Sequence, residues 1–361
     1  MASLQPKILA GLVIAAAGNL VAILIDWLVL RRQMSPSGWS VPGDFQIFRG
    51  GALAIFGHST MVGQLMYPPP FLLLIAPFTV LPPEAGDLLW GLAGMLVLAL
   101  ATRRIGLRCS QICLGLLSPP VLYCVTMGQS GLFVSAALLL ALALADEAPV
   151  LAGIAAGCVI IKPQFGLLLP ICLIAARQWR AVAAAAVTVG VLCALPALLF
   201  GPWVWKLFYS AQLGAARGVV ANPGTFPEHM MITPFILFRA LGMTAHGAGL
   251  FQAMASLLAI AACWSIWSRG DESAQTVDRL AVTSCLVALV TPYGYVYDLP
   301  VLAVALLAYG AKQRPGWLAA VAIFWGATGA YGLISTFILP AGALLMIALL
   351  LAVWPTRIRA R

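Results

Sequence analysis

Long apolar segments separated by short polar turns dominate this chain. Runs such as Ile8–Leu30, Ala181–Phe200 and Thr336–Trp354 are long enough to cross about 30 Å of hydrocarbon as α-helices. They lack the alternation that is typical of strands, and a backbone in lipid must satisfy its hydrogen bonds internally. The pattern therefore predicts an all-α polytopic membrane protein.

About twelve transmembrane helices are expected, in one domain that covers residues 1–361. They are predicted at residues 8–30, 87–102, 109–126, 129–145, 149–161, 164–176, 181–200, 246–267, 279–292, 298–311, 316–334 and 336–354. Segments as short as 149–161 would have to tilt or extend into flanking residues. Two long polar stretches, residues 31–86 and 201–245, are predicted as loops on one face of the membrane.

The first long loop contains two further elements of its own. Five apolar residues recur in it at helical spacing: Phe45, Phe48, Ala52, Ile55 and Phe56. They predict an amphipathic helix that lies along the membrane surface. Phe71–Leu81 is apolar but bracketed by prolines and too short to span, so it is predicted as a re-entrant or surface helix.

Composition and charge support the membrane assignment. Hydrophobic residues make up 62% of the chain and charged residues 9%, which excludes a soluble globule. The net charge of +9 is spread among loop ends, which favours orientation signals over nucleic-acid binding. If both termini lie in the cytoplasm, most Lys and Arg residues fall in short cytoplasmic loops, although Arg31 and Arg32 oppose this orientation. The long loops then face the periplasm of a bacterial inner membrane.

Common soluble-enzyme motifs are missing from the sequence. It contains no GxGxxG, P-loop, HExxH, GxSxG or D-x-D motif, and no soluble domain remains once the helices are assigned. All eight cysteines lie in or beside apolar segments, and no CxxC pair occurs. We expect them to be small buried hydrophobes, not disulfide partners or zinc ligands.

Asp44 is the first candidate for chemistry. It follows Pro42-Gly43 at the beginning of the predicted amphipathic helix, where an N-cap role is one interpretation. The other is a carboxylate at the mouth of a membrane cavity that acts as a general base. Further along, Tyr67 precedes three prolines, and Gly128-Gln129-Ser130-Gly131 breaks two apolar spans, for which a tight turn is the simpler interpretation.

Lys162 is the second candidate. Pro163 suits the first position of a helix, so Lys162 would lie beside the positive end of that helix. A cation is electrostatically misplaced there unless an anion is also bound, which indicates a phosphate site. Snorkelling of the side chain to the membrane interface is the alternative.

Two other outer segments contain polar side chains. In the second long loop, the tryptophans are typical of a membrane interface, whereas Arg217, Glu228 and His229 suggest substrate contacts. In the turn before residue 299, Tyr297 and Asp298 are candidates, although Asp298 also suits a helix cap.

The order of several short motifs resembles glycosyltransferase family 87, also known as DUF2029. They are Asp44-Phe45 with Phe48-Arg49, Tyr67-Pro68-Pro69 with Ala76-Pro77 and Leu81-Pro82, Gly128-Gln129, Ala152-Gly153 with Lys162-Pro163, and Arg177–Arg180. The resemblance covers most of the chain and is strongest between residues 44 and 180. It implies a GT-C fold and a sugar, mannose in known members, that arrives on a polyprenyl phosphate.

The resemblance also implies roles for residues. Asp44 would deprotonate the acceptor hydroxyl, and transfer from a β-linked lipid phosphate would invert to an α-glycoside. We expect Lys162, Arg217 and Arg49 to bind the donor phosphate. The expected substrate contacts are Tyr67, Gln129, His229, Glu228, Tyr297 and Asp298. Many family members carry a Trp/His-rich stretch where this chain has Pro292–Asp298, so no histidine role is carried over.

The periplasmic face lacks nucleotide sugars, so a lipid-linked donor also follows from the predicted orientation. The acceptor is expected to be a lipid or glycan, with no metal, cofactor or nucleic acid required, and the protein is expected to be a monomer. The main alternative is a transporter or flippase, which should show midplane polar groups and an internal repeat; the sequence shows neither. A third possibility is a membrane assembly factor without catalysis.

Overall fold

The computed structural model describes Gly18, Val21 and residues 43–57, 65–221, 230–268, 276–312, 314 and 316–354, without the side chains of 215–221, 333, 336 and 337. Within these ranges the chain is helical, with one isolated bridge, between Met231 and Tyr295, and no strand. The α-helices are α2 (Asp44–Phe56), α3 (Pro70–Thr79), α4 (Pro83–Arg104), α5 (Cys109–Leu116), α6 (Pro119–Thr126), α7 (Gly131–Ala143), α8 (Pro149–Cys158), α9 (Leu169–Ala175), α10 (Trp179–Phe200), α11 (Trp203–Ala221), α12 (Pro234–Ala240), α13 (Ala245–Trp267), α14 (Thr276–Val290), α15 (Pro300–Ala311), α16 (Trp317–Gly329), α17 (Tyr331–Phe337) and α18 (Gly342–Val353). Three short 3₁₀ helices are η1 (Val159–Ile161), η2 (Pro163–Gly166) and η4 (Val296–Asp298).

Local sequence explains where many of these helices begin. Proline occupies the first helical position of α3, α4, α6, α8, α12 and α15, where its missing N–H is no loss and its fixed φ is already helical. Two helices have threonine caps: Thr233 Oγ1 accepts from the N–H of Ile236, and Thr244 Oγ1 accepts from the N–H of Gly247. The turns between helices are thus encoded locally.

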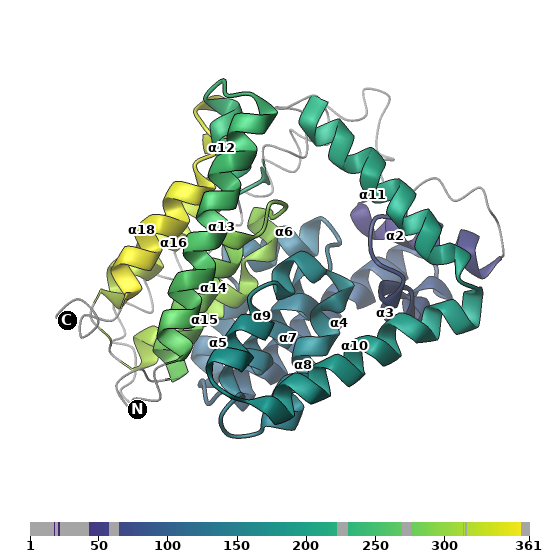
Figure 1. The fold of residues 1–361 in the computed structure, drawn as a ribbon, viewed down its shortest axis with the longest axis horizontal. Helices are drawn as coiled ribbons and strands as arrows, with labels where there is room; N and C mark the ends of the chain where they lie inside the picture. Colours follow the sequence, from purple (N-terminus) through teal and green to yellow (C-terminus); the bar gives the residue numbers. More distant parts are fainter. Residues whose placement is uncertain are drawn as a thin grey trace.

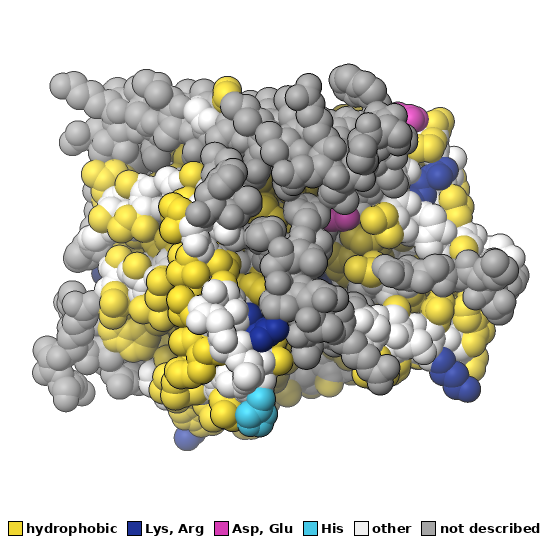
Figure 2. Space-filling view, turned by 90° about the horizontal axis from the view of Figure 1, so that it is seen from above, with side chains coloured by type: hydrophobic (Ala, Val, Ile, Leu, Met, Phe, Trp, Pro, Cys, Tyr) yellow, Lys and Arg dark blue, Asp and Glu magenta, His cyan; other side chains and the backbone are white. Residues whose placement is uncertain are grey.

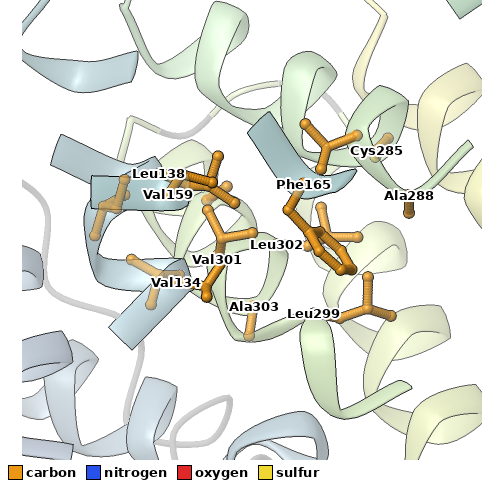
Figure 3. Packing of buried hydrophobic residues seen from close by; sticks show 14 of the residues in the cluster. Val134, Leu138, Val159, Phe165, Cys285, Ala288, Leu299, Val301, Leu302 and Ala303 are labelled. Atoms are coloured by element: carbon orange, nitrogen blue, oxygen red, sulfur yellow. The ribbon is translucent and has the colours of Figure 1, made fainter. Parts of the chain in front are cut away.

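The helices form one bundle around a buried centre. Figure 1 shows α13, α16 and α18 on one side, α2, α10 and α11 on the other, and α5 to α9 between them. Nearly all described side chains of α14 and α15 are buried, because these two helices pack between α13, α16 and α18 on one side and α7 on the other. Figure 3 shows how Val134 of α7, Phe165 of η2, Cys285 of α14 and Leu302 of α15 contribute to this core.

Small residues let α8 and α10 approach each other closely. A Cβ atom at Gly153 would lie 2.3 Å from the carbonyl oxygen of Ala181, and one at Gly157 would lie 2.5 Å from Cβ of Thr188. Two glycines four residues apart on one helix face are typical of helix pairs packed in membranes. The pair brings α10 against α8, the helix that leads to Lys162.

Apolar helices indicate membrane association, although few of them are long. Among the described residues, three helices are long and apolar enough to cross a membrane: α4, α10 and α13. The segment predicted as a span at 109–126 consists of α5 and α6, which are bent by 55° and would make a fourth. Predicted span 279–292 overlaps the buried helix α14, and the remaining ones correspond to shorter apolar helices. Nearly all of predicted span 8–30 lies outside the described residues.

The surface fits this picture. On α10 the exposed side chains include Val187, Val191 and Leu198, the last 81% exposed, as expected of a helix that faces lipid. Figure 2, which shows the molecule from above, shows mainly hydrophobic described side chains, with charged ones scattered singly.

The loop predictions had mixed outcomes. The helix predicted from Phe45, Phe48, Ala52, Ile55 and Phe56 is confirmed as α2, although Phe45, Ala52 and Ile55 are buried within the protein and do not face a membrane surface. The helix predicted at 71–81 is present as α3. The stretch 201–245 is not a plain loop, because it contains α11 and α12. Its apolar residues favour the helix α11, and Pro234, which follows the capping residue Thr233, begins α12.

The expectation that every cysteine is buried holds for only four of the eight. Cys124, Cys172, Cys263 and Cys285 are buried, Cys158 and Cys193 are partly buried, and Cys109 and Cys113 are exposed. Those two lie on α5, whose apolar surface is not fully covered by its neighbours.

Candidate active site

Asp44 is the first residue of α2 and is tied to the turn after α6. Its backbone N–H donates to the carbonyl oxygen of Met127 at 3.0 Å. The N-cap is Gly43, and no side-chain cap hydrogen bond is present, so the N-cap interpretation of Asp44 was wrong. The carboxylate is therefore free for another partner, and its Oδ2 accepts a hydrogen bond from Nε2 of Gln129.

The turn that carries Gln129 depends on Gly128. Gly128 has φ +67°, in the region that favours glycine, and a Cβ there would lie 2.7 Å from Cβ of Phe45. The turn predicted from the sequence is thus confirmed, and it also has a second role. By letting α2 approach closely, it brings the amide of Gln129 to Asp44.

Gln129 links Asp44 to a tyrosine. Its Oε1 accepts from the hydroxyl of Tyr67 at 3.0 Å, and this hydroxyl in turn accepts from Oγ of Ser130 at 3.0 Å. The backbone carbonyl of Gln129 accepts from Nε1 of Trp90 at 3.2 Å. Since each of these groups is buried and bonded, the amide cannot rotate without leaving polar atoms unpaired.

Burial changes the acidity of Asp44. Desolvation raises the pKa of its carboxyl above the ordinary value of 3.8, and the Gln129 hydrogen bond and the positive charge of Lys162 oppose this shift. A carboxylate that is poorly solvated and whose pKa is raised is a better proton acceptor than a free aspartate. These are properties that suit a general base.

Lys162 forms a second centre next to this one. It lies between η1 and η2, is 4% exposed, and forms an ion pair with Oδ1 of Asp298, which is 3% exposed. Oδ2 of Asp298 accepts from the backbone N–H of Tyr295 at 3.2 Å. Asp298 therefore does not cap α15, whose N-cap is Leu299. It instead bonds the N–H of Tyr295, the N-cap of η4, while its Oδ1 pairs with Lys162.

Aromatic rings enclose this ion pair. Nζ of Lys162 lies 5.6 Å from the ring centroid of Tyr67, 5.4 Å from that of Phe165 and 5.3 Å from that of Tyr297. Cation–π contacts of this kind partly replace the water that burial removes from the ammonium. Tyr67 belongs to both centres, because its hydroxyl bonds Gln129 and its ring faces Lys162.

The structure brings six of the predicted site residues together. They are Asp44, Tyr67, Gln129, Lys162, Tyr297 and Asp298. Arg49 has other contacts: its Nη2 donates to the carbonyl oxygens of Thr79 at 3.2 Å and Leu81 at 3.1 Å, which ties α2 to the end of α3. Glu228, His229 and the side chain of Arg217 lie outside the described residues.

Sequence reasoning missed several members of the cluster. Trp90 lies in an apolar span and gave no sign that its indole would reach Gln129. Ser130 was treated as part of a turn, and Lys162 and Asp298 were considered separately although they pair across 136 positions. Contacts at such separations have no local signal. The described residues contain no group of three His, Cys, Asp or Glu side chains that could hold a metal ion.

The fold and the cluster define a membrane-associated helical protein with a buried polar site at one end of its bundle. The family model of glycosyltransferase family 87 matches residues 65–292, more than half of the chain. The chain belongs to this family, and it is a glycosyltransferase enzyme. Tyr67, Gln129 and Lys162 lie inside the matched range, whereas Asp44, Tyr297 and Asp298 lie outside it. No curated protein and no solved structure matches the chain.

Proposed function

We propose that this glycosyltransferase moves a sugar, mannose in the first instance, from a polyprenyl-phosphate donor to a lipid or glycan acceptor. The reaction takes place at the periplasmic face of a bacterial inner membrane, in a GT-C-type bundle, and inverts the anomeric centre. The observation that supports this best is the half-buried carboxylate of Asp44, held by Gln129 and with its pKa raised by burial.

Asp44 is proposed to take the proton from the acceptor hydroxyl. The acceptor oxygen then bonds to C1 of the sugar while the bond from C1 to the phosphate oxygen breaks, and its electron pair leaves with that oxygen. A β-linked donor would give an α-glycoside, through an oxocarbenium-like transition state as in other sugar transfer. Proton acceptance by a positioned carboxylate is typically worth about 10²–10⁴ in rate.

The apolar character of the helices supports a donor that is carried by a lipid. A polyprenyl chain can stay in the bilayer while its phosphate reaches a polar cluster at the membrane surface. No metal or cofactor is proposed, so EDTA should leave the rate unchanged, and the protein is proposed to act as a monomer.

The proposed phosphate contact of Lys162 is constrained by its partner. The ammonium has three N–H donors, of which one serves Asp298, so two can meet a phosphate oxygen. However, Lys162 and Asp298 together have no net charge. Lys162 would therefore bind an anion mainly through its two remaining N–H donors and less through long-range attraction. Arg217, whose side chain is not described, remains a proposed partner for the same phosphate.

The class of activity can be tested with purified protein, radiolabelled polyprenyl-phosphate mannose and a membrane lipid extract. We expect label to appear on a new lipid or glycan product that α-mannosidase releases. A parallel reaction with a labelled nucleotide sugar is the control, and it should give no product. Label that stays on the original lipid donor would favour the transporter; product from the nucleotide sugar would exclude the proposed donor.

The orientation has its own test. A membrane-impermeant maleimide should label an Asp44→Cys variant in cells whose outer membrane has been permeabilised. The exposed Cys109, at the opposite end of the bundle beside Arg108, supplies an internal control that should react only after the inner membrane is broken. The reverse pattern would place Asp44 in the cytoplasm and remove the argument for a lipid-linked donor.

A further inference from the structure

Two tyrosines face the ammonium of Lys162 from similar distances, but they use their hydroxyl groups differently. The hydroxyl of Tyr67 is bonded to both Gln129 and Ser130. That of Tyr297 makes no hydrogen bond to any residue in the described part of the chain, although Tyr297 is only 6% exposed. A largely buried phenol without a protein partner still has a hydrogen bond to donate, and a water, an ion or a ligand can accept it.

Tyr297 is held firmly by its surroundings. It lies in η4 between two buried helices, and its ring stacks on that of Tyr295 with centroids 4.9 Å apart and planes at 12°. The next residue, Asp298, is fixed by Lys162 and by the N–H of Tyr295. The hydroxyl therefore has a defined position in the site before any substrate binds.

The hydroxyl is also kept as a donor. Burial raises the pKa of Tyr297 well above its ordinary value, and the nearby charges of Asp298 and Asp44 act in the same direction. Tyr297 and Asp44 belong to one cluster, because Gln129 bonds both Asp44 and Tyr67, and the rings of Tyr67 and Tyr297 both face Lys162. The phenol stays protonated at any physiological pH.

The two described cations proposed for the donor phosphate each have a protein partner already. Lys162 pairs with Asp298, and the guanidinium of Arg49 donates to two backbone carbonyls. An anion that forms beside Asp44 therefore needs a neutral donor in addition. Fixed neutral donors such as tyrosine hydroxyls can stabilise developing negative charge in a water-poor site, because they need no reorganisation during the reaction.

We propose that the hydroxyl of Tyr297 donates a hydrogen bond to the phosphate oxygen that leaves the sugar, which makes Tyr297 a catalytic residue. This inference depends on the proposed function. As the bond from C1 to this oxygen breaks, the electron pair stays on the oxygen and strengthens the hydrogen bond. The proton stays on Tyr297, while the proton of the acceptor goes to Asp44.

The test is the Tyr297→Phe variant, assayed beside wild type with polyprenyl-phosphate mannose. The matched control is Tyr209→Phe, because Tyr209 is 63% exposed on α11. We expect Tyr297→Phe to lower kcat by about 10²-fold with little change in KM for the donor, since removing one donor to a developing oxyanion has an effect of this size. The control should keep wild-type kcat.

Two further readouts separate catalysis from structure. The unpartnered hydroxyl supports no other described residue, so Tyr297→Phe should unfold at the wild-type temperature. It should also bind the product analogue polyprenyl phosphate more weakly by about tenfold, while its affinity for uncharged polyprenol stays the same.

The outcomes are distinguishable. If wild type transfers sugar and Tyr297→Phe keeps kcat within twofold, the role of Tyr297 is excluded while the proposed function stands. An equal loss of affinity for polyprenol and polyprenyl phosphate would also exclude it, because the contact would then not be to phosphate. If wild type does not use the lipid donor, the proposed function itself fails.

Discussion

Charged side chains join distant segments at both ends of this bundle, but the two ends treat them differently. At the end that contains Asp44, here called the site end, the side chains of Lys162 and Asp298 are 5% and 2% exposed. At the opposite end, Arg104 and Glu147 are separated by 4.0 Å, with side chains 52% and 71% exposed. Two further pairs at that end, Arg279–Asp146 at 3.1 Å and Arg314–Asp278 at 2.6 Å, each have at least one partly exposed side chain.

The comparison separates charges that organise loops from charges that serve chemistry. Removing an ion from water has a penalty of several kcal/mol, which a buried pair recovers only with very good geometry and extra hydrogen bonds. Pairs at the opposite end largely avoid this penalty because water still reaches them. A buried ion pair beside the half-buried carboxylate of Asp44 is therefore poorly explained by stability alone, and better explained by the needs of a reaction.

The largest expected effect comes from removing the carboxylate at the site end. Asp44→Asn keeps the size of the side chain but cannot accept the proton, so we expect sugar transfer to fall by about 10²–10⁴ with an unchanged unfolding temperature. The matched control is Asp146→Asn at the opposite end, where one carboxylate bonds Arg279 and Gln178. Asp146→Asn should keep most of the activity, and full activity of Asp44→Asn would remove Asp44 as the base.

A second prediction concerns the buried pair. Lys162→Met leaves Asp298 buried without a counter-ion and should destabilise the protein by about 3–5 kcal/mol, whereas the double variant Lys162→Met/Asp298→Leu should recover most of this loss. Thermal unfolding in detergent measures both. The double variant also tests the phosphate contact: a raised KM for the donor supports it, and a wild-type KM would leave Lys162 only as the partner of Asp298.

The third prediction follows the pKa of Asp44. The general base works when ionised, so activity should fall as pH decreases through this raised pKa. The hydrogen bond from Gln129 lowers the pKa, and its loss in Gln129→Leu should raise the pKa further and move the acid limb of the pH–rate profile to higher pH. Gln178→Leu removes the amide that donates to Asp146 at 2.9 Å and is the control, with no shift expected.

The same contrast explains what could be predicted from the sequence. Hydrophobic periodicity and prolines at helix starts are local signals, and they located most helices, including α2 from Phe45 to Phe56. The bend between α5 and α6 was missed although Pro119 marks the start of α6, because residues 109–126 were treated as one apolar run. Likewise, the segment that forms α11 was predicted as part of a loop because it contains polar residues such as Lys206 and Gln212.

Individual site residues could be proposed from the sequence, but their contacts with one another could not be predicted. Asp44, Gln129 and Lys162 were visible as polar residues at breaks in apolar runs. Their partners lie far along the chain: Asp44 bonds a residue 85 positions away, and Lys162 pairs with one 136 positions away. Such pairings are set by how helices pack, and the single sequence contains no pattern that predicts them.

The smallest expected effect tests the other half of the comparison. Arg104→Ala removes the most exposed of the ion pairs among the described residues, which should be worth no more than about 1 kcal/mol because water and salt screen both partners. We expect the variant to unfold at a temperature close to that of wild type and to transfer sugar at the wild-type rate. Added salt should change the stability difference between the two proteins by no more than about 1 kcal/mol. Glu147→Ala should behave in the same way, since it breaks the same contact. A loss from either variant as large as that from Lys162→Met would mean that exposure does not separate the two kinds of charge in this bundle.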